Sequence, residues 1–193
     1  MDRSRLTAMT DGFLAIIITI MVLGLVPPGG ARWGDLRAVG ASVLLYGLSF
    51  IYLGIYWNNH HHFYHLVDHV TGGLLWANLH LMFWLSLIPF ATAWLGQNPR
   101  AAAPTALYGI LLLLAALAWG LMEKVALRLQ GRGSRLARAL GRDWKVRLSP
   151  LLYVAGIGVA FWRPWLGDAF YILCAGLWLI PDRRVERALR SES

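Results

Sequence analysis

Six apolar segments, separated by short polar, proline-containing or basic stretches, dominate this chain of 193 residues. A helix needs about 20 mostly apolar residues, or about 17 at the short end, to cross a bilayer. Hydrophobic residues make up 58% of the chain and charged residues 15%, below the rough quarter that water-soluble domains carry. We therefore predict an all-α membrane protein, a single domain over residues 1–193. Its six transmembrane helices are expected at about 7–26, 36–60, 72–95, 103–122, 148–162 and 165–180.

Several classes of protein are excluded by composition and motifs. The single cysteine, Cys174, lies inside an apolar run, so neither an internal disulfide nor a cysteine-based metal site can form. The chain has no nucleophile–base pair, no glycine-rich phosphate loop and no catalytic pair of carboxylates, so we do not expect an enzyme. The net charge of +8 does not indicate nucleic-acid binding, because the basic residues gather between apolar segments and at the C-terminus.

The distribution of Lys and Arg predicts the orientation. With six spans, the N-terminus, the second and fourth loops and the C-terminus share one side, where they carry 2, 0, 8 and 4 basic residues. The other side carries four: Arg32, Arg37, Arg100 and Arg163. The positive-inside rule therefore puts both termini in the cytoplasm of a multi-pass protein of the cell membrane. The abundance of Arg and Ala suggests a bacterial source.

Two segments, the first apolar segment and the basic loop 123–147, allow more than one interpretation. The first segment is not expected to be a cleaved signal peptide, because Asp11 directly precedes its apolar core and Pro-Pro-Gly-Gly follows it. The basic cytoplasmic loop 123–147 is either a charged loop that fixes orientation or an interfacial helix in contact with membrane lipids. In the second case its apolar side would carry Leu136, Leu140 and Trp144.

Polar side chains inside apolar segments are candidate functional residues, because they are costly in a membrane. Arg5 and Asp11 are six residues apart, on different faces of a helix, so each is expected to find its partner on a neighbouring helix. His61, His65 and His69 follow at i, i+4 and i+8, on one helical face. This face could bind a metal or haem, sense or conduct protons, or form a network that holds helices together.

The first apolar segment also has a regular stripe. Ile16, Ile20 and Leu23 are spaced i, i+4 and i+7, and Thr19 follows Ile16 by three residues on the same side. Lipid-facing residues look identical in a membrane helix, and a threonine there usually bonds to its own backbone. The spacing alone therefore leaves open whether the stripe faces a pore or lipid.

A motif at this helix resembles a known family. Residues 5–13 read RLTAMTDGF and run into AIIITIMVLGL, which is similar to the R-x-x-x-F-S-D signature of the transmembrane protein 175 family. These are the endosomal and lysosomal potassium channels and their prokaryotic relatives. Met9 stands for the Phe of the motif and Thr10 for its Ser. Three further stretches agree: WNNHH at 57–61, LLWANL at 74–79 running to SLIPF at 86–90, and WLIPDRR at 178–184.

The resemblance implies a homotetrameric potassium channel, with the pore lined by the first helices and no P-loop selectivity filter. It assigns the hydrophobic constriction to Ile16, with Ile20 and Leu23 on the following turns, and the pore threonine to Thr19. Potassium would be preferred modestly over sodium, and no cofactor is expected besides the permeant ion. A supporting network near the pore would comprise Arg5, Thr10, Asp11, Trp57, His60, His61 and Asn78. The alternatives are a metal or haem site on His61, His65 and His69, or a proton-conducting channel.

Overall fold

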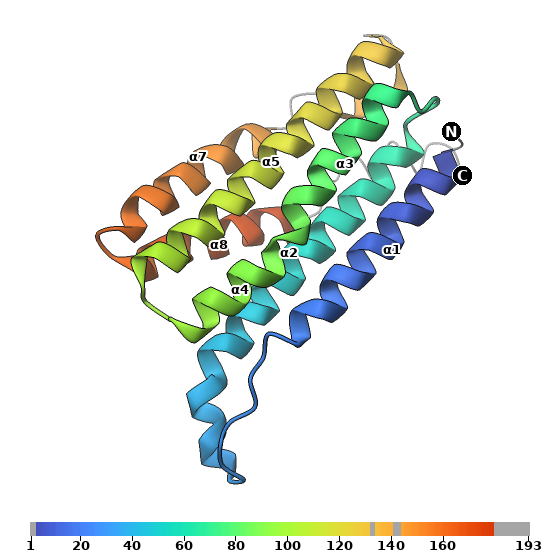
Figure 1. Cartoon of the computed structure of the whole chain (residues 1–193). Coiled ribbons are helices and arrows are strands. Elements are labelled where there is room, and N and C mark those ends of the chain that lie inside the picture. Colours follow the sequence, from blue (N-terminus) through green and yellow to red (C-terminus); the bar gives the residue numbers. More distant parts are fainter. Residues whose placement is uncertain (1–2, 132–133, 141–143, 180–193) are drawn as a thin grey trace.

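The computed structural model describes residues 3–131, 134–140 and 144–179, and the regular elements in this part of the chain are all helices, joined by short loops (Figure 1). A 3₁₀ helix, η1, covers Trp33–Val39 and leads into the second α-helix. The α-helices are α1 (Arg3–Val22), α2 (Gly40–His65), α3 (Gly72–Ser86), α4 (Ile88–Gln97), α5 (Ala102–Gln130), α6 (Arg135–Leu140), α7 (Trp144–Ala160) and α8 (Pro164–Leu179).

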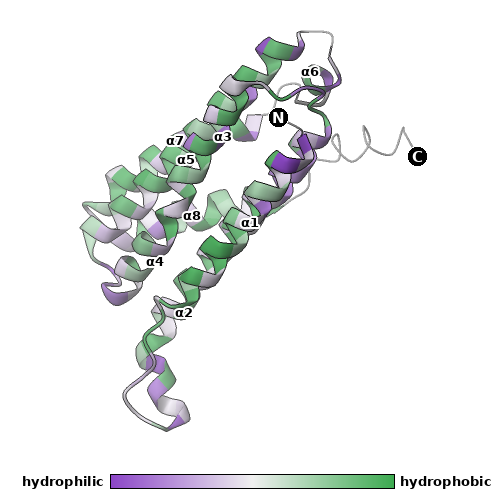
Figure 2. Cartoon of the chain, turned by 45° about the vertical axis from the view of Figure 1, so that its right-hand side comes forward, coloured by the Kyte–Doolittle hydropathy of each residue, from purple (hydrophilic) through white to green (hydrophobic). Residues whose placement is uncertain are grey.

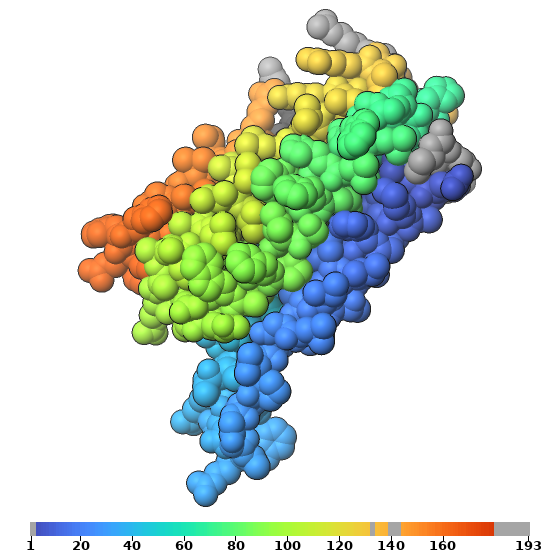
Figure 3. Space-filling model, viewed as in Figure 1, coloured from blue at the N-terminus to red at the C-terminus, as the bar shows by residue number. Residues whose placement is uncertain are grey.

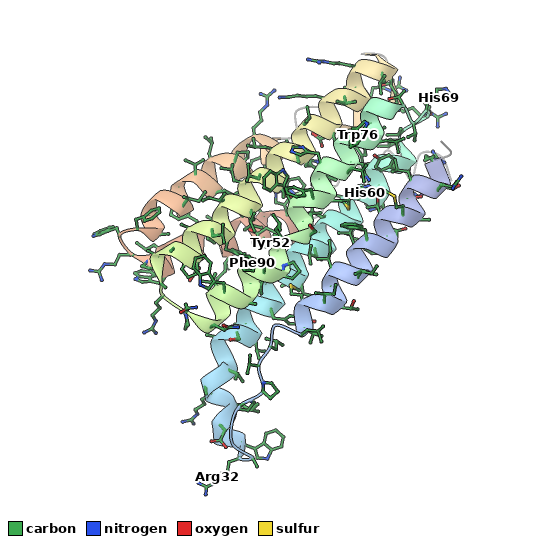
Figure 4. All side chains as sticks on the ribbon, in the orientation of Figure 1. Arg32, Tyr52, His60, His69, Trp76 and Phe90 are labelled. Carbon is green, nitrogen blue, oxygen red and sulfur yellow. The ribbon has the colours of Figure 1, made fainter. Side chains whose placement is uncertain are left out.

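The helices form an elongated bundle in which α5 lies between α3 and α7 (Figure 1). The helix α1 packs against α2, α3 and α4, at one edge of the bundle. In the space-filling view it forms a ridge along that edge (Figure 3). The start of α2 and the segment with η1 project beyond the other helices, with Arg32 at the tip (Figure 4).

Four segments of the described chain are long and apolar enough to cross a membrane: Arg3–Val22, Trp33–His65, Gly72–Gln97 and Ala102–Gln130. Hydrophilic residues concentrate toward the ends of the bundle, with hydrophobic residues between them (Figure 2). The remaining helices α7 and α8 have 17 and 16 residues. These lengths are at the short end for a membrane crossing, where local thinning of the bilayer or flanking residues can make up the difference.

The first two helices end at different residues from those expected. The helix α1 begins at Arg3 and ends at Val22, four residues before the expected end at residue 26. Pro27 accounts for this end, because proline disfavours helical backbone at the preceding residue and clashes with the carbonyl four residues back. The helix α2 starts at Gly40 rather than residue 36 and continues to His65 rather than 60, through most of the histidine-rich stretch.

The third apolar segment, expected as one helix over 72–95, is divided at Leu87 into α3 and α4. Pro89 lies in the first turn of α4 and has no N–H to donate to the carbonyl of Leu85. The hydroxyl of Ser86 donates to the carbonyl of Phe83 at 2.7 Å, so the end of α3 is partly satisfied locally. The two halves together still form one apolar segment long enough to cross a membrane.

The fourth helix extends into the segment expected to be a loop. The helix α5 ends at Gln130, eight residues past the expected residue 122, because the intervening residues are good helix formers. The indole of Trp119 donates to Glu123 at 2.8 Å across this boundary. Gly131, with φ of 80°, follows the helix in a conformation that favours glycine.

The rest of segment 123–147 contains α6 and the start of α7, with 132–133 and 141–143 outside the described residues. Leu136 and Trp144, two of the three residues on the apolar side of the possible interfacial helix, differ in burial. Leu136 is buried in the six-residue α6, whereas Trp144 begins α7 and is half exposed. The side chain of Leu140 is outside the described residues, as is residue 180 at the end of the last predicted span.

The helices α5, α7 and α8 approach closely at glycines. A Cβ on Gly156 would lie 2.6 Å from the ring of Tyr171, and a Cβ on Gly109 would also overlap Tyr171. The Tyr171 hydroxyl donates to the carbonyl of Thr105 at 3.2 Å. The missing side chains therefore create the space that this buried tyrosine fills.

Candidate functional site

The stripe on α1 is exposed in the single chain. Ile16 is 58% exposed, Ile20 51%, and Leu23, in the turn after the helix, 79%. The opposite face of α1 is buried against the bundle through Leu6, Thr10, Leu14, Ile17 and Met21. The helix therefore has one face packed against its own chain and one apolar face that its own chain leaves uncovered.

Thr19 lies on the uncovered face, and its hydroxyl donates to the carbonyl of Ile16 at 2.9 Å. This is the local backbone bond expected of a threonine in a membrane helix. Because the hydroxyl hydrogen is used within the helix, the oxygen keeps its lone pairs for an acceptor role. A threonine in this state presents an oxygen to whatever covers the face.

A buried chain of polar groups joins α1 to α3 and α2. The amide nitrogen of Asn78 donates to Thr10 Oγ1 at 3.0 Å, and Asn78 Oδ1 lies 2.9 Å from His60 Nε2. Because the Asn78 oxygen is an acceptor, His60 Nε2 carries the proton and donates. All three side chains are at most 1% exposed. In Figure 4, His60 lies between α1 and α3.

The chain of contacts continues from His60 toward α5. The imidazole of His60 lies 4.5 Å from the ring of Tyr64, centroid to centroid. The Tyr64 hydroxyl donates to Met122 Sδ at 3.7 Å. One connected set of side chains thus holds α1, α3, α2 and α5 at the same end of the bundle.

Asp11 and Trp57 form a second link between α1 and α2. The indole N–H of Trp57 donates to Asp11 Oδ1 at 3.0 Å, and the Trp57 ring lies 6.4 Å from that of His61. Asp11 thus has its partner on a neighbouring helix, as expected, and that partner is Trp57. Arg5 is exposed, and within the described residues no hydrogen bond joins it to Asp11, Trp57 or the histidines.

The three histidines proposed as a metal-binding face are not on one helix. The helix α2 ends at His65, so His69 lies four residues past its end, in the segment before α3. Figure 4 shows His69 near the end of the molecule opposite Arg32. His61 and His65 remain together, with 3.1 Å between their Nε2 atoms. Among the described residues, no group of three His, Cys, Asp or Glu is arranged to hold a metal ion.

Two features of this region were not expected from the sequence. Arg3 Nη1 donates to the carbonyls of His65 at 3.4 Å and Val67 at 3.3 Å, which ties the start of α1 to the end of α2. Ser49 Oγ lies 2.7 Å from Thr92 Oγ1 and 2.9 Å from the hydroxyl of Tyr108. The sequence did carry a signal for the Ser49 hydrogen bonds, because hydroxyl side chains inside apolar segments need hydrogen-bond partners.

Comparison with known proteins gives a consistent result. The family model described as the endosomal/lysosomal potassium channel TMEM175 matches residues 5–89. A protein of Chryseobacterium sp. (strain P1-3), named a potassium channel, is 48% identical over 98% of this chain and 99% of its own. A Streptomyces collinus protein, also named a potassium channel, is 31% identical over 61% of each chain.

A solved structure has the same fold. It is the crystal structure of a lysosomal potassium-selective channel TMEM175 homologue from Chamaesiphon minutus. The TM-score is 0.80 at 24% sequence identity, and the match covers 92% of this chain and 96% of the other.

Proposed function

This chain belongs to the TMEM175 family of potassium channels, and from that premise we propose that four copies form a potassium channel in a bacterial cell membrane. The proposed pore runs between the four α1 helices. Potassium ions, membrane lipids and further copies of the chain are its expected partners. The named relatives are channels and not enzymes, and we expect neither enzymatic activity nor a cofactor.

The uncovered face of α1 is the observation that carries the proposal. Packing within the chain buries one side of α1 and leaves Ile16, Thr19, Ile20 and Leu23 exposed on the other. Around a fourfold axis, identical faces meet one another, so each of these side chains would become a ring of four. Thr19 would contribute a ring of acceptor oxygens that an ion in the pore could use.

The ring of Ile16 is the proposed gate. Four branched hydrocarbon side chains around a narrow axis expel water, and an ion cannot replace its hydration shell with methyl groups. The rings of Ile20 and Leu23 lengthen this apolar constriction over the next two turns. Rotation or outward movement of α1 would open it, since either motion separates the four side chains.

Thr19 is the proposed source of a modest preference for potassium over sodium. Four Oγ atoms with free lone pairs would offer oxygen dipoles to a partly dehydrated ion. Potassium loses its water more readily than sodium, so a ring of weak oxygen ligands admits it at lower cost. The chain contains no TVGYG-like sequence that could form a filter of backbone carbonyls.

The polar links at the end of α1 have a supporting role in this proposal. Thr10, Asn78 and His60 form one buried link, and Asp11 with Trp57 forms another beside His61. They would hold the cytoplasmic end of α1 while the gate moves. Arg5 would act separately, since it shares the exposed side of α1 and would face the pore entrance. Both termini are expected in the cytoplasm, beside the basic segment that includes α6.

The test is ion flux from proteoliposomes loaded with potassium and diluted into sodium, comparing the wild type with Ile16→Asn. We expect flux from the wild type that is greater for potassium than for sodium, and faster flux from the variant because an amide lets water into the constriction. Ile172→Asn on α8 is the matched control, since Ile172 is 57% exposed against 58% for Ile16. Equal flux from all three proteins would contradict the gate, and no flux from any would contradict the channel.

A further inference from the structure

Two exposed histidines face each other on the last turn of α2. His61 and His65 are four residues apart, their ring centroids are 4.5 Å apart and their Nε2 atoms 3.1 Å apart. In the metal-free pair one Nε2–H donates to the other ring, because two like-protonated nitrogens would repel. Both rings therefore present the same nitrogen to one point beside the helix.

This spacing suits a shared metal ion. At metal–nitrogen bonds of about 2.05 Å, two nitrogens 3.1 Å apart subtend roughly 98° at the metal, between the octahedral and tetrahedral angles. Two histidines at i and i+4 on one helix supply metal ligands in other proteins for the same geometric reason. The pair is also accessible, since both side chains are exposed.

We propose that His61 and His65 form a binding site for a divalent transition-metal ion of the Zn²⁺, Ni²⁺ or Cu²⁺ type. The metal takes the place of the shared proton and is held by the two Nε2 atoms. No third His, Cys, Asp or Glu in the described part of the chain completes a protein-only site, so water fills the other positions. Imidazole without carboxylate or thiolate favours these metals over Mg²⁺ or Ca²⁺.

The location gives the site a structural consequence. His61 lies beside Trp57, which bonds to Asp11 on α1, and the carbonyl of His65 accepts from Arg3. Because a metal bridging the two rings braces the last turn of α2, it stiffens the turn to which the start of α1 is tied. Binding itself does not depend on ion conduction, so this inference stands apart from the proposed function.

Calorimetric titration of the full-length protein with Zn²⁺, after removal of any histidine tag, tests the site. We expect one Zn²⁺ per chain in the wild type, and a roughly 100-fold weaker affinity in His61→Ala and in His65→Ala, because each loses chelation. His80→Ala is the control: His80 is exposed, and its Nε2 accepts a hydrogen bond from Trp84 instead of facing a histidine. Its affinity should equal that of the wild type.

Electron paramagnetic resonance of bound Cu²⁺ gives an independent readout. Coupling to two imidazole nitrogens in the wild type and to one in each single variant would support the site. Undiminished Zn²⁺ affinity in both His61→Ala and His65→Ala, or loss of binding in His80→Ala alone, would overturn the proposal. Absence of Zn²⁺ binding to the wild type would overturn it too.

Discussion

Asn78 is the residue whose replacement should most weaken the attachment of α1 to the bundle. Its amide hydrogen-bonds both Thr10 on α1 and His60 on α2, and it is fully buried. Leucine has a similar size and cannot form either bond. In Asn78→Leu, the N–H of His60 and the hydroxyl of Thr10 would remain buried without these partners.

The size of the effect follows from the two bonds lost. Hydrogen bonds between membrane helices contribute about 0.6 kcal/mol on average and about 1.7 kcal/mol at most. Two such bonds, both fully buried, give an expected loss of about 1–3 kcal/mol in the free energy of unfolding. A double-mutant cycle with Thr10→Val isolates one of them and should give a coupling of about 0.6 kcal/mol or more.

The assay is unfolding in mixed micelles with increasing SDS, followed by circular dichroism. Thr7→Val is the matched control for the cycle. Thr7 is on the same helix, and its hydroxyl donates to the backbone carbonyls of Arg3 and Ser4 and to no side chain among the described residues. The changes in unfolding free energy caused by Thr7→Val and Asn78→Leu should add, whereas those caused by Thr10→Val and Asn78→Leu should not. Additivity within about 0.3 kcal/mol for Thr10→Val would refute the coupling.

Three further substitutions test other contacts. Gly109→Ala places a methyl group against Tyr171 and should cost about 1–3 kcal/mol of unfolding free energy in the same SDS assay; an unchanged midpoint would contradict the tight packing. Trp57→Phe keeps a ring but removes the donor to Asp11, so the free energy of unfolding should fall by about 1 kcal/mol. An unchanged free energy of unfolding would show that this exposed bond contributes nothing to stability. Thr19→Val keeps the shape but replaces the oxygen with a methyl group, so the potassium-to-sodium permeability ratio from reversal potentials should fall toward one. A ratio equal to that of the wild type would remove Thr19 from selectivity.

The all-helical membrane architecture was predictable because it depends on local properties of the chain. Long apolar runs specify membrane helices, and Pro27 marked the end of α1 to within a few residues. Pro89 also carried the signal for the break between α3 and α4, although a single helix was expected there. The extension of α5 past residue 122 was missed because charge suggested a loop, whereas the residues there favour helix.

The candidate site depended more on contacts between distant residues. Thr10 and Asn78 are 68 positions apart, and no periodicity within either helix indicates that they pair. The family motif brought these residues to attention but did not specify the bonds. Spacing alone grouped His69 with His61 and His65, because it assumed a helix that in fact ends at His65. Interhelical geometry and helix ends are therefore what the sequence left undetermined.

The central claim is that the uncovered face of α1 lines the ion-conducting pore. Leu23→Cys, made in a Cys174→Ala background, tests it with a cationic methanethiosulfonate applied to both sides of potassium-loaded proteoliposomes. Leu23 is 79% exposed, and Ile172→Cys at 57% exposure is the control. Our account predicts that modification of Leu23→Cys abolishes most of the potassium flux, because four charged adducts would fill the pore, while Ile172→Cys keeps its flux. Unchanged flux through a Leu23→Cys channel shown by mass spectrometry to be fully modified would contradict it.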